Sequence, residues 1–385
     1  MTAAPRAVRG RVMRADRQLD DGVVTIEGER IACVAAFAEW VGRHPDSPVP
    51  EHAGTILPGL VDIHNHGGHG HGFDTVDPDR ARAAARYHAA HGTTTVLAGI
   101  LTAPAEEMIA QIASLREVAA EGTIGGIYAE GPYLSGVRCG AQDPRYVRDP
   151  DPDLTERLLD AGGGHLRVMT LAPELPGYGA VAQQLSDAAV TIALGHTDAD
   201  YSRFLDALRP AGAAGLVTHL ANAMPALHHR APGPVAAALV AAARGSAVVE
   251  LIGDGAHVDA GFAALVFAAA PGAVALVTDA MRAAGMPDGH YRLGPREVRV
   301  TAGIARLPDG ALAGGTATLL ECLRWTVYSA HVPLPIAVAA ATAVPARAAG
   351  LTEVGDLRTG MYADLVIVDD NLRLRGVLRH GQWLT

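Results

Sequence analysis

Eight apolar runs rich in β-branched residues recur along the chain, each bounded by turn residues and separated from the next by enough sequence for one helix. Strand and helix that alternate eight times predict a (β/α)8 TIM barrel, in which an inner ring of parallel strands is covered by helices. The predicted barrel strands are Leu57–Ile63, Thr93–Leu101, Thr123–Ala129, Leu166–Leu171, Val190–Leu194, Gly215–Thr218, Ala247–Ile252 and Ala273–Thr278.

Side chains of the kinds that bind metals or move protons follow six of the eight runs. In barrels of this type the catalytic residues come from the C-terminal ends of several different strands, so we expect these side chains to meet at one rim. They are His64 and His66 after the first run, Glu130 after the third, His196 after the fifth, His219 after the sixth, Asp254 with His257 after the seventh, and Asp279 after the eighth.

Any one of these residues has an ordinary structural explanation, since a lone histidine is often a hydrogen-bonded core or surface residue and an acidic residue after a strand often caps a helix. His64 and His66 differ because side chains two positions apart on a strand point to the same face, where both rings can reach one cation. The joint pattern therefore predicts a metal site. We interpret His69 and His71, in a glycine-rich stretch, as loop residues.

The composition argues against several classes of protein. A net charge of −10 and the lack of a basic stripe with interleaved aromatic residues argue against nucleic-acid binding. The cysteines Cys33, Cys139 and Cys322 are too dispersed to predict a disulfide framework or a cysteine zinc site. We find no segment with the length of a membrane span and no apolar leader, and we expect a cytoplasmic protein without membrane contact.

All 31 basic residues are arginine, and none is lysine. The chain therefore has no lysine for a Schiff base and none for the carbamylated lysine that bridges two metals in many metallo-hydrolase barrels. Any bridging anion supplied by a side chain must be a carboxylate, and Glu130 is the candidate.

Short strand-like segments also occur at both ends of the chain. Residues 22–32 predict two strands around a Glu-Gly turn, and residues 363–368 and 375–382 predict further strands. We expect the two ends to pair into a small β-sandwich domain made of residues 1–55 and 352–385, beside a barrel made of residues 56–351.

The motifs together resemble the amidohydrolase superfamily and, within it, the N-acetylglucosamine-6-phosphate deacetylases. The resemblance to the superfamily rests on Pro58–Gly67 and Gly360–Val366. The resemblance to the deacetylases rests on Ala129–Tyr133, Leu171–Glu174, Gly195–Thr197, Thr218–Met224, Asp254–Val258 and Val277–Ala280, which span nearly the whole chain in the expected order.

The resemblance implies that Glu130, His196 and His219 bind one divalent metal and that His64 and His66 add ligands for a second, so one or two ions per subunit are expected. Asp279 is a further expected metal ligand. Zinc is the expected metal, with iron, cobalt and manganese as alternatives, because imidazole and carboxylate suit all four. A bound metal lowers the pKa of water from about 15.7 toward 7 and polarises an amide carbonyl. Asp279 is then the expected general base and acid, taking a proton from the attacking water and passing it to the departing amine.

For a phosphorylated amino sugar, the resemblance places Asn222, Ala223 and His257 around the phosphate, with Arg230 reaching in from a second subunit of a homodimer. The alternative for Arg230 is an ordinary surface arginine on a loop. Relatives usually carry a histidine near the acyl oxygen where this chain has Gln142. A neutral amide can donate a hydrogen bond but supplies no cationic stabilisation, so the exact 2-acetamido sugar stays open.

Two other functions compete with amide hydrolysis of such a sugar. Another amidohydrolase reaction, either cyclic-amide hydrolysis or deamination of a base, would not need the phosphate-binding residues Asn222, Ala223 and Arg230. A metal-free barrel that serves as a binding module would be expected to have lost ligands at its strand ends, and all six are present.

Overall fold

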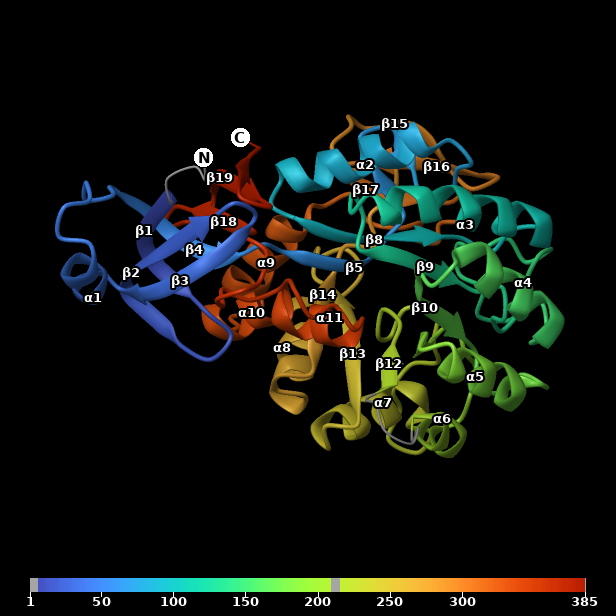
Figure 1. Ribbon diagram of the computed structural model, residues 1–385. Helices are drawn as coiled ribbons and strands as arrows, with labels where there is room; N and C mark the ends of the chain where they lie inside the picture. Colours follow the sequence, from blue (N-terminus) through green and yellow to red (C-terminus); the bar gives the residue numbers. More distant parts are fainter. Residues whose placement is uncertain (1–5, 209–214, 385) are drawn as a thin grey trace.

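The computed structural model describes residues 6–208 and 215–384. Its largest feature is an eight-stranded parallel sheet with the order β14-β13-β12-β11-β10-β9-β8-β5 (Figure 1). The sheet curls until its edge strands meet, since the Asp279 amide donates to the His64 carbonyl at 2.9 Å and the His66 amide donates to the Ala280 carbonyl at 2.7 Å. The strands are β5 (Val61–Asn65), β8 (Thr95–Ile100), β9 (Gly126–Glu130), β10 (Leu166–Leu171), β11 (Thr191–Leu194), β12 (Gly215–Val217), β13 (Ala247–Ile252) and β14 (Val274–Val277). The predicted (β/α)8 barrel is confirmed.

Helices surround the barrel and cover the outer face of its strands (Figure 1). Four of them begin directly after an aspartate whose side chain accepts backbone N–H groups of the first turn, which satisfies donors that have no partner inside the helix. These caps are Asp77, Asp151, Asp200 and Asp259. The helices are α2 (Pro78–Ala90), α3 (Ala105–Ala120), α4 (Pro152–Gly162), α5 (Tyr178–Asp187), α6 (Tyr201–Ala207), α7 (Gly233–Ala243), α8 (Ala260–Ala269), α9 (Leu319–Tyr328), α10 (Leu334–Ala340) and α11 (Ala343–Ala348).

The interior of the barrel is a packed core and not a channel. Apolar side chains from all eight strands fill it, because strands that are covered on both faces bury every residue. They include Val61, Ile63, Leu97, Tyr128, Val168, Ala193, Leu216, Val248, Ile252, Ala275 and Val277. Any binding site must therefore lie above this core, where the strands end.

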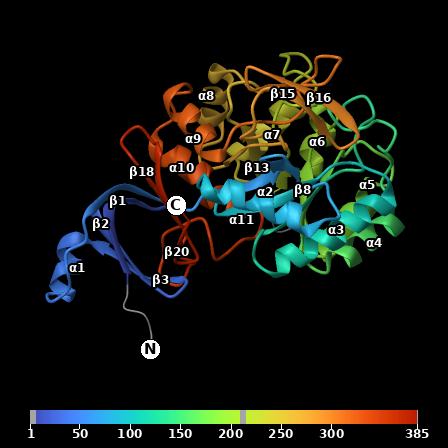
Figure 2. The same cartoon turned by 90° about the horizontal axis from the view of Figure 1, so that it is seen from above.

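The two ends of the chain form one seven-stranded sheet beside the barrel, with the order β20-β19-β18-β4-β1-β2-β3. Seen from above, the N-terminal and C-terminal strands lie together on one side of the molecule (Figure 2). The strands are β1 (Arg6–Met13), β2 (Gln18–Glu27), β3 (Arg30–Ala36), β4 (His52–Pro58), β18 (Leu365–Val368), β19 (Leu374–Arg379) and β20 (Gln382–Trp383), with the helix α1 (Phe37–Arg43) next to them.

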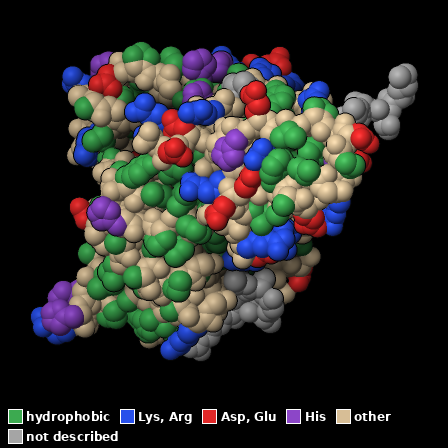
Figure 3. Space-filling view, turned by 90° about the vertical axis from the view of Figure 1, so that its left-hand side faces the viewer, with side chains coloured by type: hydrophobic (Ala, Val, Ile, Leu, Met, Phe, Trp, Pro, Cys, Tyr) green, Lys and Arg blue, Asp and Glu red, His purple; other side chains and the backbone are tan. Residues whose placement is uncertain are grey.

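The predicted pairing of the two chain ends is confirmed, although the described strands form one sheet and not the two of a sandwich. The proposed limits of the small domain, 1–55 and 352–385, stay a prediction, and residues 1–5 and 385 lie outside the described residues. On the face shown in Figure 3, which includes this sheet, arginines and carboxylates are interspersed. Arg30 and Glu353, 2.7 Å apart, are one pair that ties the two chain ends together.

The first predicted barrel strand, Leu57–Ile63, is wrong as a single element. Residues up to Pro58 belong to β4 in the small sheet, and the barrel strand β5 begins at Val61. At the break, the Gly59 amide donates to the Asp364 carbonyl at 2.8 Å, and a side chain at Gly59 would collide with Thr94. Apart from Asp62 the run is apolar, and both of its parts are buried, so periodicity could not reveal the break.

The sequence reasoning also missed an insertion after β14. The strands β15 (Gly289–Leu293), β16 (Arg296–Thr301) and β17 (Ile304–Arg306) form a separate antiparallel sheet before α9. Residues 67–72 form a small hairpin, β6 (Gly67–Gly68) and β7 (His71–Gly72). His69 lies in its turn, as expected for a loop residue, whereas His71 lies in β7 and not in a loop. Within residues 6–208 and 215–384, every helix is too short or too polar for a bilayer crossing.

Candidate metal centre

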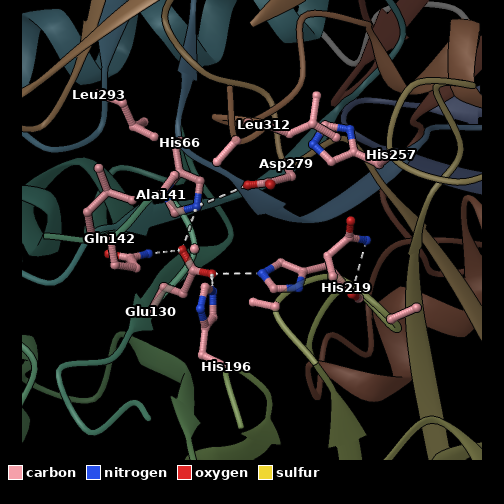
Figure 4. A pocket seen from close by; sticks show the side chains of 17 residues that line it. His66, Glu130, Ala141, Gln142, His196, His219, His257, Asp279, Leu293 and Leu312 are labelled. Carbon is pink, nitrogen blue, oxygen red and sulfur yellow. Dashed lines mark hydrogen bonds and ion pairs between the residues drawn. The ribbon is translucent and has the colours of Figure 1, made fainter. Parts of the chain in front are cut away.

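A cavity of about 300 Å³ opens at the C-terminal ends of the barrel strands (Figure 4). Most of the predicted site residues line it. Apolar residues of the insertion and of neighbouring loops also line it. The lining residues are His66, Leu101, Glu130, Gly140, Ala141, Gln142, His196, His219, Ala221, Asn222, Ala223, His257, Asp279, Leu293, Ala311, Leu312 and Gly314.

Glu130 stands at the centre of this cavity and is almost fully buried. Its Oε1 lies 2.8 Å from His196 Nε2 and 2.9 Å from His219 Nε2. Its Oε2 lies 3.2 Å from His66 Nε2 on the other side. Oε1 therefore faces a first set of imidazoles, His196 and His219, while Oε2 faces His66. His64 Nε2 lies 3.8 Å from Oε1, so this oxygen is near rings of both sets. A carboxylate whose two oxygens face different imidazoles can serve as a bridging ligand.

The second set consists of His64, His66 and Asp279. The Nε2 atoms of the two histidines lie 3.2 Å apart, and Asp279 Oδ1 lies 3.7 Å from His64 Nε2 and 3.3 Å from His66 Nε2. Ligand-type atoms of His64, His66 and Asp279 fall within 4.8 Å of one another, as do those of His64, Glu130 and His219. The predicted ligands are thus brought together as two overlapping groups.

The hydrogen bonds around the rings fit a divalent cation. The Nδ1 atom of His64 lies 2.8 Å from a carboxylate oxygen of Glu250, that of His66 lies 3.1 Å from the Gly99 carbonyl, and that of His196 lies 2.9 Å from the Arg138 carbonyl. A proton held at Nδ1 by such an acceptor leaves the lone pair on Nε2. His66 and His196 line the cavity, and His64 lies beneath it with its Nε2 3.2 Å from His66 Nε2. His219 differs, since its buried Nδ1 has no hydrogen-bond partner among the described residues.

The carboxylates of the centre are held in their ionised form. Burial by itself raises the pKa of Glu130, but His196 and His219 outweigh it and hold the pKa well below the usual range. Burial also acts to raise the pKa of Asp279, yet the hydrogen bond from His66 and the charge of His64 bring it below its ordinary value. Both groups are therefore available at neutral pH as ligands or as a base.

Backbone geometry at the strand ends turns the side chains toward the cavity. His196 and Asp279 have φ angles of 46° and 47°, in the left-handed region that residues with a side chain rarely adopt. Ala223 has a φ of 51°. Strain of this kind is typical of functional sites, because surrounding structure must hold the residue in place.

The predicted phosphate-binding residues occupy one end of the cavity, with one exception. Asn222, Ala223 and His257 line it, and His257 Nδ1 lies 2.7 Å from Asp254 Oδ2. Burial lowers the pKa of His257, but the hydrogen bond with Asp254 outweighs it and raises the pKa above its usual value. Arg230 does not line the cavity of this single chain. It is exposed, with Nη1 2.7 Å from His229 Nε2.

Gln142 reaches the centre from the loop after β9. Its Oε1 accepts a hydrogen bond from the Thr102 amide at 2.8 Å, which fixes the orientation of the side-chain amide. Its Nε2 then donates to Glu130 Oε2 at 2.5 Å. The NH₂ group of Gln142 is therefore aimed at the centre, where it can serve as a hydrogen-bond donor.

Sequence reasoning missed two side chains beneath the ligands. Glu250 in β13 and Tyr128 in β9 are both fully buried, and the Tyr128 ring packs against His64 with centroids 4.5 Å apart. A carboxylate within the otherwise apolar strand 247–252 was the available signal for Glu250. The sequence carried no corresponding signal for Tyr128, because tyrosine is common in buried strands.

The chain matches the model of the amidohydrolase family over residues 55–384. The N-acetylglucosamine-6-phosphate deacetylase of Vibrio furnissii is 32% identical, with 94% of this chain and 91% of that protein covered. The N-acetylgalactosamine-6-phosphate deacetylase of Escherichia coli O157:H7 is 34% identical, with 97% of each covered. A solved structure of a mutant N-acetyl-D-glucosamine-6-phosphate deacetylase from Mycobacterium smegmatis, in complex with N-acetyl-D-glucosamine-6-phosphate, is 37% identical with a TM-score of 0.92 and covers 100% of both chains. From its strand-end ligands, its fold and these relatives, the chain belongs to the amidohydrolase family and, within it, to the N-acetylglucosamine-6-phosphate deacetylases.

Proposed function

We propose that the chain removes acetate from N-acetylglucosamine 6-phosphate or a closely related 2-acetamido sugar phosphate. The observation that carries this proposal is the position of Glu130, whose two oxygens face His196 and His219 on one side and His66 on the other, with Asp279 beside them. A divalent cation bound there lowers the pKa of water and polarises an amide carbonyl. The relatives named above act on sugar phosphates of this kind.

Asp279 supplies the proton transfers in this proposal. Its side chain is 15% exposed and faces the cavity, and its pKa lies below its ordinary value. Its carboxylate can therefore take a proton from an attacking water molecule and then deliver that proton to the amide nitrogen as the C–N bond breaks. An amine is a poor leaving group until it is protonated, so one residue serves both steps.

The phosphate of the substrate is proposed to lie at the end of the cavity formed by Asn222, Ala223 and His257. Arg230 is proposed to reach this end from a second copy of the chain. Its planar guanidinium suits phosphate oxygens, and Arg230 does not line the cavity of its own chain. The active form is therefore a homodimer. We also propose that the protein works in the cytoplasm.

Two divalent ions are proposed to bind, bridged by Glu130, and zinc is the proposed metal, with iron, cobalt and manganese as alternatives. Elemental analysis of the purified protein measures both identity and number. A protein purified without any metal, and inactive after metals are added back, would favour a non-catalytic barrel.

The function is tested by acetate release from N-acetylglucosamine 6-phosphate, N-acetylgalactosamine 6-phosphate and the two sugars without phosphate. We expect release from at least one phosphorylated sugar and much slower release from both free sugars. N-Acetylgalactosamine 6-phosphate is a second candidate, because the relative from Escherichia coli O157:H7 covers 97% of this chain. Ammonia release from bases, or ring opening of cyclic amides, without acetate release from any sugar would replace the proposal with another amidohydrolase reaction.

A further inference from the structure

Glu250 connects two of the metal-ligand strands from below the centre. It lies in β13, has no exposed surface, and none of its neighbours in the strand is charged. Its Oε2 lies 2.8 Å from His64 Nδ1 and accepts a hydrogen bond from the His219 amide at 3.0 Å. One oxygen atom therefore holds a ligand side chain from β5 and a ligand backbone that follows β12.

The group that His64 Nδ1 contacts is charged, unlike the groups at Nδ1 of the other ligand rings. His66 and His196 have neutral backbone carbonyls at Nδ1, whereas His64 has a carboxylate. A carboxylate at this position fixes the ring and makes Nε2 a stronger donor to a cation than a carbonyl does. Among the four imidazoles of the centre, only His64 has a carboxylate at Nδ1 within the residues that the structure describes.

Within the described part of the chain, the side chain of Glu250 makes its hydrogen bonds through one oxygen only, so it is not part of a wider network. Glu250 Oε1 is buried and has no hydrogen-bond partner among the described residues. Burying a carboxylate with one oxygen unpaired is costly, and a barrel core gains nothing from it that an apolar residue would not supply. A cation held by His64 Nε2 would offset that cost.

We propose that Glu250 is a positioning residue that makes His64 a competent ligand and thereby secures the second cation, held by His64, His66 and Asp279. This inference rests on the proposed two-ion site and extends it. A site at Glu130, His196 and His219 would depend on Glu250 through the His219 amide and, more remotely, through His64, whose Nε2 lies 3.8 Å from Glu130 Oε1.

The substitution Glu250→Gln separates the charge of this side chain from its two contacts. Gln is nearly the same shape and keeps one oxygen that can accept from both His64 and His219, but it removes the charge. We expect the chelator-treated full chain, titrated with Co²⁺ and followed by visible absorption and elemental analysis, to bind two ions in the wild type. In E250Q we expect the second ion to bind about ten- to a hundredfold more weakly, with the affinity for the first ion changed much less.

The matched control is Tyr128→Phe. It removes a buried hydroxyl that bonds Thr218 and Thr170 in the same layer, while the ring stays against His64. We expect Y128F to bind both ions as the wild type does. A weakening of the second ion in Y128F equal to that in E250Q would mean that any disturbance of this layer has the effect, and would overturn the specific role of Glu250.

A double-mutant cycle with His64→Asn tests whether Glu250 acts through His64. We expect H64N to bind one ion, and H64N/E250Q to bind that ion with unchanged affinity, because the contact is already gone. Two ions bound by E250Q with wild-type affinity would overturn the inference alone. Failure of E250Q to fold while H64N folds would overturn it too, since Glu250 would then be needed by the barrel. One ion in the wild type would instead refute the two-ion part of the proposed function.

Discussion

Asp279 is the residue on which the proposed chemistry depends most directly. Its carboxylate lies 3.3 Å from His66 Nε2 and opens to the cavity. We expect Asp279→Asn to lose nearly all turnover, because an amide cannot accept the proton of the attacking water. Metal content, measured by elemental analysis, should stay close to that of the wild type, because Asn keeps a side-chain oxygen at the same place and His64 and His66 remain. Activity above about a tenth of the wild-type value would remove Asp279 from this role.

Gln142 is the residue through which this chain departs from the histidine usual among relatives. Its amide is held by Thr102 so that the NH₂ group points to the centre. We expect Gln142→Ala to lower kcat about a hundredfold on every accepted sugar, because a donor aimed at the developing oxyanion is lost. We expect Gln142→His to keep turnover of N-acetylglucosamine 6-phosphate or raise it.

Steady-state kinetics on both hexosamine phosphates separate two roles of Gln142. If Q142H loses turnover of N-acetylglucosamine 6-phosphate while the galactosamine derivative is hydrolysed as before, Gln142 selects the sugar and does not support the oxyanion. Gln142→Asn is the control for amide chemistry, since it keeps the NH₂ group on a side chain one carbon shorter.

At the scale of elements, the helices depend on their aspartate caps. Asp151 Oδ1 accepts the Asp153 and Leu154 amides, both at 3.1 Å, at the start of α4. We expect Asp151→Ala to reduce the free energy of unfolding by about 1 kcal/mol. The melting temperature should fall by about 1 °C, measured by circular dichroism, with catalytic activity unchanged.

Asp149→Ala is the matched control, because Asp149 is an exposed aspartate in the same loop with no hydrogen bond to the helix among the described residues. We expect its melting temperature to equal that of the wild type. An equal decrease in both variants would attribute the effect to the charge of the loop and not to the cap.

At the scale of the whole molecule, the proposed dimer makes each cavity dependent on two chains. Asp279 lines its own cavity, while Arg230 does not line the cavity of its own chain. We expect Arg230→Ala to raise the KM for the phosphorylated sugar strongly and D279N to abolish turnover, so neither homodimer is efficient. Equal mixing with subunit exchange should restore about a quarter of wild-type sites, since half of the dimers are mixed and each has one complete site.

Activity of the mixture no higher than the mean of the two separate variants would place Arg230 outside the partner's cavity. Size-exclusion chromatography with light scattering of the same samples shows whether dimers are present. A monomeric wild type with full activity would likewise refute the shared site.

Local sequence patterns were sufficient for the barrel and for most of the centre. The spacing of His64 and His66 places both rings on one face of a strand, whatever the rest of the chain does. Glu130, His196, His219 and Asp279 follow buried strands, and parallel strands in a barrel end at the same rim. These properties are set by the chain over a few residues and by one rule of topology, so the sequence by itself determined them.

The features that the sequence did not reveal depend on which residues of distant strands are paired. Glu250 meets His64 across 186 positions of sequence, and this contact depends on how the barrel closes. The division of residues 57–63 between two sheets likewise depends on the partner at Asp364, because both halves are buried. Burial and alternation indicate that a residue faces the interior, but only the tertiary structure decides which residue it meets there, since that is fixed by backbone pairing between distant strands.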